Sequence, residues 1–181
     1  MIKLPHLSLL SVTALAAALT SGCATIEDIP EQRVGVANLA FANGLPAGTA
    51  QLFAHGDEVT LGVLATGLAP GEHGFHLHTT GRCEGPDFKS ARGHLNPTNR
   101  THGRLSPGGK HLGDMPNLVV DSSRSARATV ELDGDRATVI DTIFDGDGTA
   151  VVIHAGPDDY RTDPAGDAGA RVACGIMRRP S

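Results

Sequence analysis

Six of the nine histidines in this chain, with one aspartate, cluster in four short stretches at intervals that suit two neighbouring metal ions. Imidazole is a common ligand for copper and zinc, and one carboxylate within a histidine set favours zinc. None of the three cysteines falls inside these stretches. A redox or hydrolytic metal enzyme is therefore favoured over a zinc finger. The candidate ligands are His76, His78, His94, His102, His111, Asp114 and His154.

These ligands divide into two sets by position. His76 and His78 lie two residues apart in a predicted strand, whose period of two turns both imidazoles to one face, so that they can bind one ion. His154 ends another predicted strand and is expected to supply a third ligand from across a sandwich. An isolated H-x-H pair is a weak signal, but the two sets together are specific. The second set lies within one loop and consists of His94, His102, His111 and Asp114.

Short β segments, separated by Gly, Pro, Asn and Asp, have to position these sets. The chain holds 23 glycines and 11 prolines but only 3% aromatic residues, so its core must be built from Val, Leu, Ile and Ala. Asn43-Gly44 and His55-Gly56-Asp57 are predicted hairpin turns. The pattern predicts an all-β domain, an eight-stranded antiparallel Greek-key sandwich or flattened barrel with long metal-binding loops. The predicted strands are 33–40, 49–54, 58–66, 74–79, 117–121, 126–132, 149–154 and 171–177.

Residues 79–116 have little strand character, although they carry four of the candidate ligands. No helix of normal length is expected beyond residue 30. A long loop without secondary structure in a compact domain is usually either functional or disordered. Metal binding would give this loop a reason to be ordered.

The first 22 residues are predicted to be a lipoprotein signal peptide. A positive start precedes an apolar run, Leu7 to Leu19, which ends at Thr20-Ser21-Gly22-Cys23. The run is too short for a membrane-spanning helix. Small residues before a cysteine are typical of lipid attachment, here at Cys23, which leaves 23–32 as a tether and 33–181 as the domain. An ordinary secretory signal, with Cys23 incidental, is the alternative.

The number of cysteines and the net charge limit where this protein is expected to work and what it is expected to bind. If Cys23 carries lipid, Cys83 and Cys174 are left to pair, and export to an oxidising compartment would let their disulfide persist. The expected location is the bacterial cell envelope or periplasm, with membrane contact only through the N-terminal lipid. A net charge of −5 argues against nucleic acid as a partner, because phosphate binding needs a basic surface. An anionic substrate would need a local positive site.

The motifs G-F-H-x-H, H-x-N-P, H-G, H-L-G-D-x-P-N-L, V-x-H-A and G-x-R-x-A-C-G follow one another along the chain. In this order they resemble the copper–zinc superoxide dismutase family over about residues 33–178. The intervals from His94 through Asp114 are similar to the family's zinc loop with no insertion. The resemblance implies copper and zinc as cofactors and superoxide as the substrate. The reaction would be dismutation to oxygen and hydrogen peroxide by a redox-cycling copper bridged to zinc through a histidine.

The resemblance also implies a role for individual residues. His94 would bridge the two metals as an imidazolate, and Arg171 would be the active-site arginine. Asp158 would link a copper histidine to a zinc histidine and fix their orientation. Cys83 and Cys174 would form the disulfide. The implied copper ligands are His76, His78, His94 and His154, and the implied zinc ligands are His94, His102, His111 and Asp114.

The stretch from His154 to Arg171 is shorter than in eukaryotic members and contains no lysine, so steering of the anion would fall to Arg171 and Arg161. Dimer contacts of the eukaryotic kind are not implied, and a homodimer remains open. One rival is a non-catalytic copper or zinc carrier with the same fold, because function lives in the site. A second rival, a zinc hydrolase, lacks a glutamate or free histidine placed as a general base.

Several residues have plainer interpretations. His6 lies in the predicted leader, and His55 is expected at the surface in a turn. The resemblance implies that His73 bonds backbone and not metal. Cys83 could instead be a metal thiolate, and Arg171 a surface ion-pair residue.

Overall fold

The computed structural model describes residues 31–181, so the predicted leader, Cys23 and most of the predicted tether lie outside the described residues. The described residues form nine β-strands, one α-helix and one short 3₁₀ helix. None of the helices in this part of the chain is long and apolar enough to cross a membrane.

The first three strands form an antiparallel meander: β1 (Gln32–Phe41), β2 (Pro46–His55) and β3 (Glu58–Thr66). His55 pairs with Glu58 across a two-residue turn. Gly44 and Gly56 have φ of 80° and 57°, the left-handed backbone that glycine accepts most readily in such turns. Both predicted turns are confirmed, and β1 begins one residue earlier than expected.

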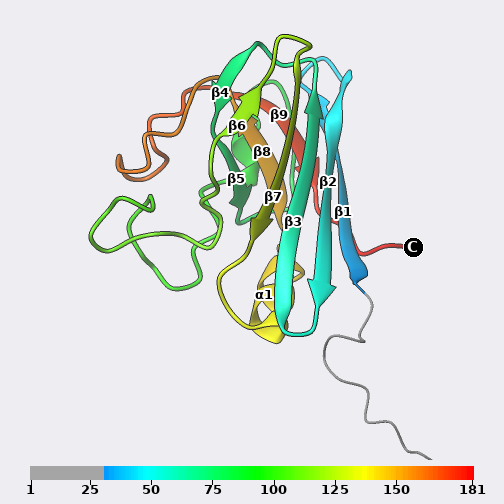
Figure 1. The fold of residues 1–181 in the computed structure, drawn as a ribbon, viewed down its shortest axis with the longest axis vertical. Helices are drawn as coiled ribbons and strands as arrows, with labels where there is room; N and C mark the ends of the chain where they lie inside the picture. Colours follow the sequence, from blue (N-terminus) through cyan, green and yellow to red (C-terminus); the bar gives the residue numbers. More distant parts are fainter. Residues whose placement is uncertain (1–30) are drawn as a thin grey trace, which may run out of the picture.

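The other strands complete a curled antiparallel sheet (Figure 1). In the seven-stranded sheet the order is β5-β8-β9-β1-β2-β3-β7, and β4 pairs with β6 separately. Neighbours such as β3 and β7, or β9 and β1, are far apart in sequence, which is the Greek-key connectivity. The predicted all-β fold is confirmed. The remaining strands are β4 (Gly71–His73), β5 (Phe75–His78), β6 (Leu118–Val120), β7 (Ser125–Glu131), β8 (Ala150–His154) and β9 (Arg171–Ile176).

Two details differ from the sequence-based expectation. The strand predicted over 74–79 is β5, and the short strand β4, which was not predicted, precedes it across Gly74, so there are nine strands and not eight. An α-helix, α1 (Arg136–Ile143), lies where no helix was expected. Its β-branched residues are weak helix formers. Asp135 nevertheless caps it by accepting from Thr138 N–H, and its buried residues Val139 and Ile143 are four apart.

Alternation in two neighbouring strands decides which residues face the core and which face the ligand loops. Phe75 and Leu77 of β5, like Val151 and Ile153 of β8, join the main apolar core. The residues between them therefore face the opposite side of the sheet. His76 and His78 lie on that side, and they are nevertheless fully buried. Something must cover them there.

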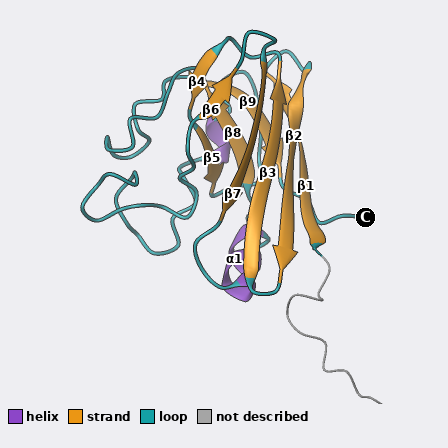
Figure 2. Cartoon of the chain, viewed as in Figure 1, coloured by secondary structure: helices purple, strands orange, loops and turns teal. Residues whose placement is uncertain are grey.

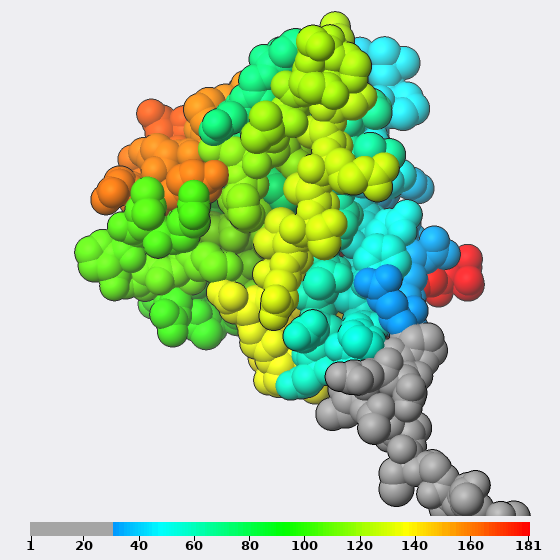
Figure 3. Space-filling model, viewed as in Figure 1, coloured from blue at the N-terminus to red at the C-terminus, as the bar shows by residue number. Residues whose placement is uncertain are grey.

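Two long loops provide the cover. Residues 79–117 connect β5 to β6 and contain the 3₁₀ helix η2 (Lys89–Ala91), and residues 155–170 connect β8 to β9. Both loops project from the same side of the sheet (Figure 2), and their atoms are in contact on the molecular surface (Figure 3). The absence of strands from residues 79–116 is confirmed.

Candidate metal centre

Four buried imidazoles converge on one point. One ring nitrogen from each lies within 4.8 Å of the others. Four of their ring nitrogens have no hydrogen-bond partner among the described residues, although unpaired buried polar atoms are costly. A metal ion would satisfy all four at once. These atoms are Nδ1 of His76 and Nε2 of His78, His94 and His154.

The second ring nitrogen of each imidazole is held by an oxygen. His78 Nδ1 lies 2.8 Å from the carbonyl of Arg92, and His154 Nδ1 lies 3.0 Å from the carbonyl of Gly169. Carboxylates hold the other two, His76 and His94. Such partners fix ring orientation and determine which nitrogen is free for a metal. The four free nitrogens are thus prearranged for one soft or borderline ion, which suits copper.

His154 reaches this set by a different route from the one expected. It ends β8, which pairs directly with β5: His76 lies opposite Val152. His154 therefore comes from the adjacent strand of the same sheet and not from across a sandwich. The expectation of a third ligand was right, but its placement was wrong, because the sequence does not show which strands are neighbours.

The second set gathers around the carboxylate of Asp114. The Nδ1 atoms of His94, His102 and His111 lie 2.8, 3.0 and 3.1 Å from Asp114 Oδ1. Ligands of tetrahedral zinc with bonds of about 2.0–2.1 Å lie about 3.4 Å apart, so this arrangement fits zinc with a small outward shift. Three histidines and one carboxylate are also a donor set that zinc accepts. All four residues are buried.

His94 belongs to both sets. Its Nδ1 faces Asp114, whereas its Nε2 faces the four-histidine set and has no hydrogen-bond partner within residues 31–181. The rings of His94 and His76 stack with centroids 3.9 Å apart. The two metal sites therefore share this one imidazole, as a bridge requires.

The Asp158 carboxylate contacts one histidine of each metal set. Its Oδ2 lies 2.8 Å from His76 Nε2, and its Oδ1 lies 3.0 Å from His102 Nε2. The carboxylate is fully buried. It thus orients one histidine of each set, as the resemblance implied.

Burial and hydrogen bonding shift the pKa of His76 in the first set and that of His102 in the second set in opposite directions. Burial lowers the pKa of His76 to about 3 and that of His154 to about 4, so both are neutral at pH 7 and free to bind a cation. Burial also opposes charge on His102, but its hydrogen bonds to Asp114 and Asp158 prevail and raise its pKa to about 9. Despite burial, the same bonds hold the pKa of both carboxyls well below the usual range. Zinc must therefore displace a proton from His102.

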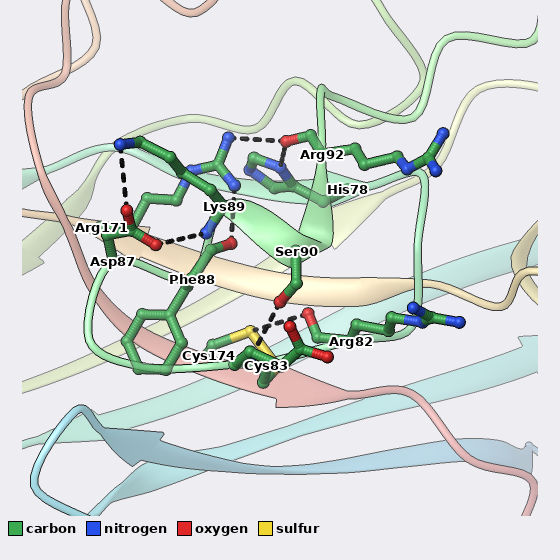
Figure 4. The surroundings of a disulfide bond; sticks show 11 residues. His78, Arg82, Cys83, Asp87, Phe88, Lys89, Ser90, Arg92, Arg171 and Cys174 are labelled. Carbon is green, nitrogen blue, oxygen red and sulfur yellow. Dashed lines mark hydrogen bonds and ion pairs between the residues drawn. A yellow bond between two sulfur atoms is a disulfide. The ribbon is translucent and has the colours of Figure 1, made fainter.

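Arg171 anchors a loop beside His78 of the copper set (Figure 4). Its Nη1 donates to the Phe88 carbonyl at 2.8 Å, and its Nη2 donates to the Arg92 carbonyl at 2.6 Å. The Arg92 carbonyl is also the partner of His78 Nδ1. Partial burial lowers the pKa of Arg171 below its usual value, but a guanidinium remains charged. Arg171 thus lies next to the copper set, and not in a surface ion pair.

A disulfide fastens the same loop to β9. Cys83 and Cys174 are bonded, with Cα atoms 5.7 Å apart. The predicted pairing is confirmed, and the alternative of a thiolate ligand at Cys83 is wrong. Arg171 and the disulfide are two attachments of one segment, residues 83–92, to one strand.

The histidines set aside from metal binding also have clear positions. His73 has a carbonyl at each ring nitrogen, that of His154 at 2.7 Å and that of Ala69 at 2.8 Å. It bonds backbone, as expected. His55 is exposed in its turn. Arg161 is exposed on the 155–170 loop, and its steering role stays a prediction.

Two residues that support the centre were missed from the sequence. Asn117 makes two side-chain hydrogen bonds to the backbone of Asp158. Tyr160 donates its backbone N–H to the Asp158 carboxylate at 2.6 Å. Asn117 lies within the H-L-G-D-x-P-N-L motif, which was a usable signal, but Tyr160 lies in a loop with no motif.

Comparison with known proteins agrees with this geometry. Residues 46–177 match the family model described as copper/zinc superoxide dismutase (SODC). The chain is 43% identical over 149 residues to superoxide dismutase [Cu-Zn] 2 of Aquifex aeolicus, covering 78% of this chain and 85% of that one.

Solved structures agree as well. A SOD-like protein from Bacillus subtilis aligns with a TM-score of 0.74 at 34% identity, over 80% of this chain and 99% of that one. Cu/Zn superoxide dismutase from Brucella abortus aligns with a TM-score of 0.64 at 26% identity, over 82% of this chain and all of that one. With its fold, its paired histidine sets and these matches, the chain belongs to the copper/zinc superoxide dismutase family.

Proposed function

We propose that this protein catalyses the dismutation of superoxide. The observation that carries the proposal is the set of four buried, unpaired ring nitrogens beside a complete zinc set, with His94 in both. A copper ion held by the first set would supply the reversible one-electron couple by which two superoxide anions and two protons give O₂ and H₂O₂. Zinc has no such couple, so its set has a structural and tuning role.

The protein's own groups bind the anion and move a proton. Arg171 has five N–H donors, two of which hold Phe88 and Arg92, so its charge is fixed in place while other donors stay free for the substrate. His94 Nε2, the unpaired nitrogen that would face copper, is the protein atom that could carry a proton to the second superoxide. The zinc set, to which His94 Nδ1 and Asp114 both belong, would hold the opposite side of that ring in place.

The carrier alternative is less well supported by the same site. A non-catalytic metal carrier has no need for a fixed guanidinium beside its metal, whereas dismutation of an anion does. The hydrolase alternative needs a general base near the metals, and each carboxylate at the centre, Asp114 and Asp158, is already bonded to histidines.

The experiment is reconstitution followed by a superoxide-decay assay. Metal-free protein should bind one copper and one zinc per chain and then accelerate superoxide decay, whereas protein loaded with zinc alone should not. Elemental analysis showing zinc but no copper uptake would favour the carrier or hydrolase reading. If the protein binds both copper and zinc fully but does not accelerate superoxide decay, the proposed catalysis is rejected and the proposed metal sites stand.

We also propose that the domain is exported and tethered to a membrane by lipid on Cys23, with residues 1–22 removed and 24–32 as spacer. The leader pattern supports this, as does the Cys83–Cys174 disulfide, because such bonds persist in oxidising compartments. Mass mapping of exported, unreduced protein should give a lipid-modified peptide beginning at Cys23. An unmodified N-terminus would contradict the anchor. A homodimer is a further proposal, testable by sedimentation.

A further inference from the structure

Asp158 orients one histidine of each metal set, yet it is held in place by residues outside both sets. Its backbone N–H donates to Asn117 Oδ1 at 2.9 Å, and its carbonyl accepts from Asn117 Nδ2 at 3.1 Å. Its Oδ1 also accepts from Tyr160 N–H at 2.6 Å. A carboxylate that orients metal-binding histidines is effective only where its own position is fixed.

Tyr160 ties together three segments that are distant in sequence. Its phenolic oxygen accepts from Asn117 N–H at 2.8 Å, and its carbonyl accepts from Leu105 N–H at 3.1 Å. The guanidinium of Arg104 lies 4.3 Å from the centre of its ring, in a cation–π arrangement. The 155–170 loop, the zinc loop and the segment entering β6 therefore meet at this residue.

The backbone around Tyr160 supports a specific role. Tyr160 has φ of 61°, a left-handed conformation that is rare for a bulky residue and persists where its surroundings fix it. Gly103 makes the close approach feasible, because a Cβ there would lie 2.0 Å from the Tyr160 carbonyl oxygen. Gly103 N–H in turn donates to the zinc ligand Asp114 at 2.8 Å. Tyr160 is therefore connected to both carboxylates of the centre, directly to Asp158 and through Gly103 to Asp114.

We infer that Tyr160 is a positioning residue for both metal sites, acting through Asp158 on His76 and His102. Its hydroxyl fixes the loop against Asn117, so that the Tyr160 N–H and the Asn117 side chain hold the Asp158 carboxylate at both histidines. The inference rests on the proposed copper and zinc sites. It adds to them a residue that touches neither metal set directly.

The test compares two substitutions that each remove one hydroxyl between the same two loops. Tyr160→Phe removes the bond from Asn117 N–H. Ser106→Ala is the matched control, because Ser106 Oγ donates to the Arg161 carbonyl at 3.2 Å and does not touch Asp158. Both variants and the parent are loaded with zinc, which keeps the protein diamagnetic for NMR.

Two readouts separate positioning from general stability. The first is the rate of zinc loss to excess chelator. Partners of ligands alter metal affinity about 10–100-fold, so Tyr160→Phe, one contact further away, should accelerate loss about 3–10-fold. The second is solvent exchange of the imidazole Nε2–H protons of His76 and His102, which should quicken in Tyr160→Phe. Ser106→Ala should resemble the parent in both. If Tyr160→Phe changes only its melting temperature, or matches Ser106→Ala, the inference is overturned.

A measurement on the unaltered protein covers the case of a variant that fails to fold. The chain has one tyrosine and no tryptophan, so its tyrosine fluorescence comes from Tyr160 alone. Emission should change in step with zinc bound to metal-free protein, and constant emission would overturn the inference. If the parent binds neither copper nor zinc, the proposed function fails. If it binds both while Tyr160→Phe behaves like the control, only this inference fails.

Discussion

Replacing Asp114 with alanine tests how far the zinc set also organises the fold. Besides three imidazole nitrogens, its carboxylate accepts two backbone N–H groups: Gly103 N–H at 2.8 Å and His111 N–H at 3.0 Å, both at Oδ2. Gly103 and His111 are buried. Asp114→Ala would therefore leave two buried backbone donors without a partner, in addition to removing a metal ligand.

The expected loss has two parts. Each unsatisfied buried donor costs about 1–3 kcal/mol, so metal-free Asp114→Ala should be less stable than metal-free parent by about 2–6 kcal/mol. In the presence of zinc the variant also loses the stability that binding supplies. If zinc saturates the parent at about 100 times its Kd and binds the variant negligibly, the further loss is about 2.7 kcal/mol.

Urea unfolding with and without zinc, with metal analysis, measures both parts. With an m-value of about 2 kcal/mol/M, a loss of 4 kcal/mol moves the midpoint by about 2 M. Asp121→Ala is the control: Asp121 also accepts two backbone N–H groups, from Ser123 and Ser125, but it is exposed, so water can replace it with little change. The reasoning is refuted if metal-free Asp114→Ala unfolds at the same urea concentration as its parent.

Three other outcomes are expected. His154→Ala should lose copper and activity but keep zinc. If elemental analysis shows that His154→Ala and Asp114→Ala lose zinc equally, the ligands have been assigned to the wrong metals. Arg171→Ala should keep both metals, lose about tenfold or more in rate at low ionic strength, and respond less to added salt, as a salt series of superoxide decay would show; a parent-like rate at low salt places steering elsewhere. Metal-free protein should melt at lower temperature on both sides of pH 6.5. The pKa of His76 falls to about 3 in the folded protein, so its contribution to the free energy of unfolding is lost as the pH decreases from 6.5 towards 3. The pKa of His102 rises to about 9, so its contribution to the free energy of unfolding is lost as the pH increases from 6.5 towards 9. Bound zinc should abolish the decrease in melting temperature above pH 6.5. A melting temperature of the metal-free protein that stays constant from pH 4 to 9 would contradict both pKa shifts.

The sequence predicted the ligands well because each one is a side chain whose type carries its chemistry. A histidine pair two residues apart in a strand, and a run of ligands in one loop, constrain geometry without knowledge of the fold. The strands were predictable for a similar reason: alternation in β7 between buried Ala126 and exposed Arg127 follows the pleat directly.

What could not be predicted depends on backbone groups and on neighbours in space. The carbonyls of Arg92 and Gly169 orient two copper histidines, but every residue has a carbonyl, so no sequence signal marks them. The placement of His154 required the pairing of β8 with β5. Helix α1 was missed because β-branched residues outweighed the cap at Asp135 and the spacing of its buried side chains.

The neighbouring positions of β1 and β9 have a consequence for when this protein can fold. β1 begins the described chain and β9 ends at Ile176, yet the two strands are neighbours in the sheet, where Ala40 pairs with Cys174. The sheet therefore closes only after nearly the whole chain has been synthesised. Pairings between distant residues also form slowly, because the loop between them must first be brought together. Late closure of the sheet suits the export proposed above, because the disulfide and the metal sites depend on strands that pair only after the last of them, β9, has been made.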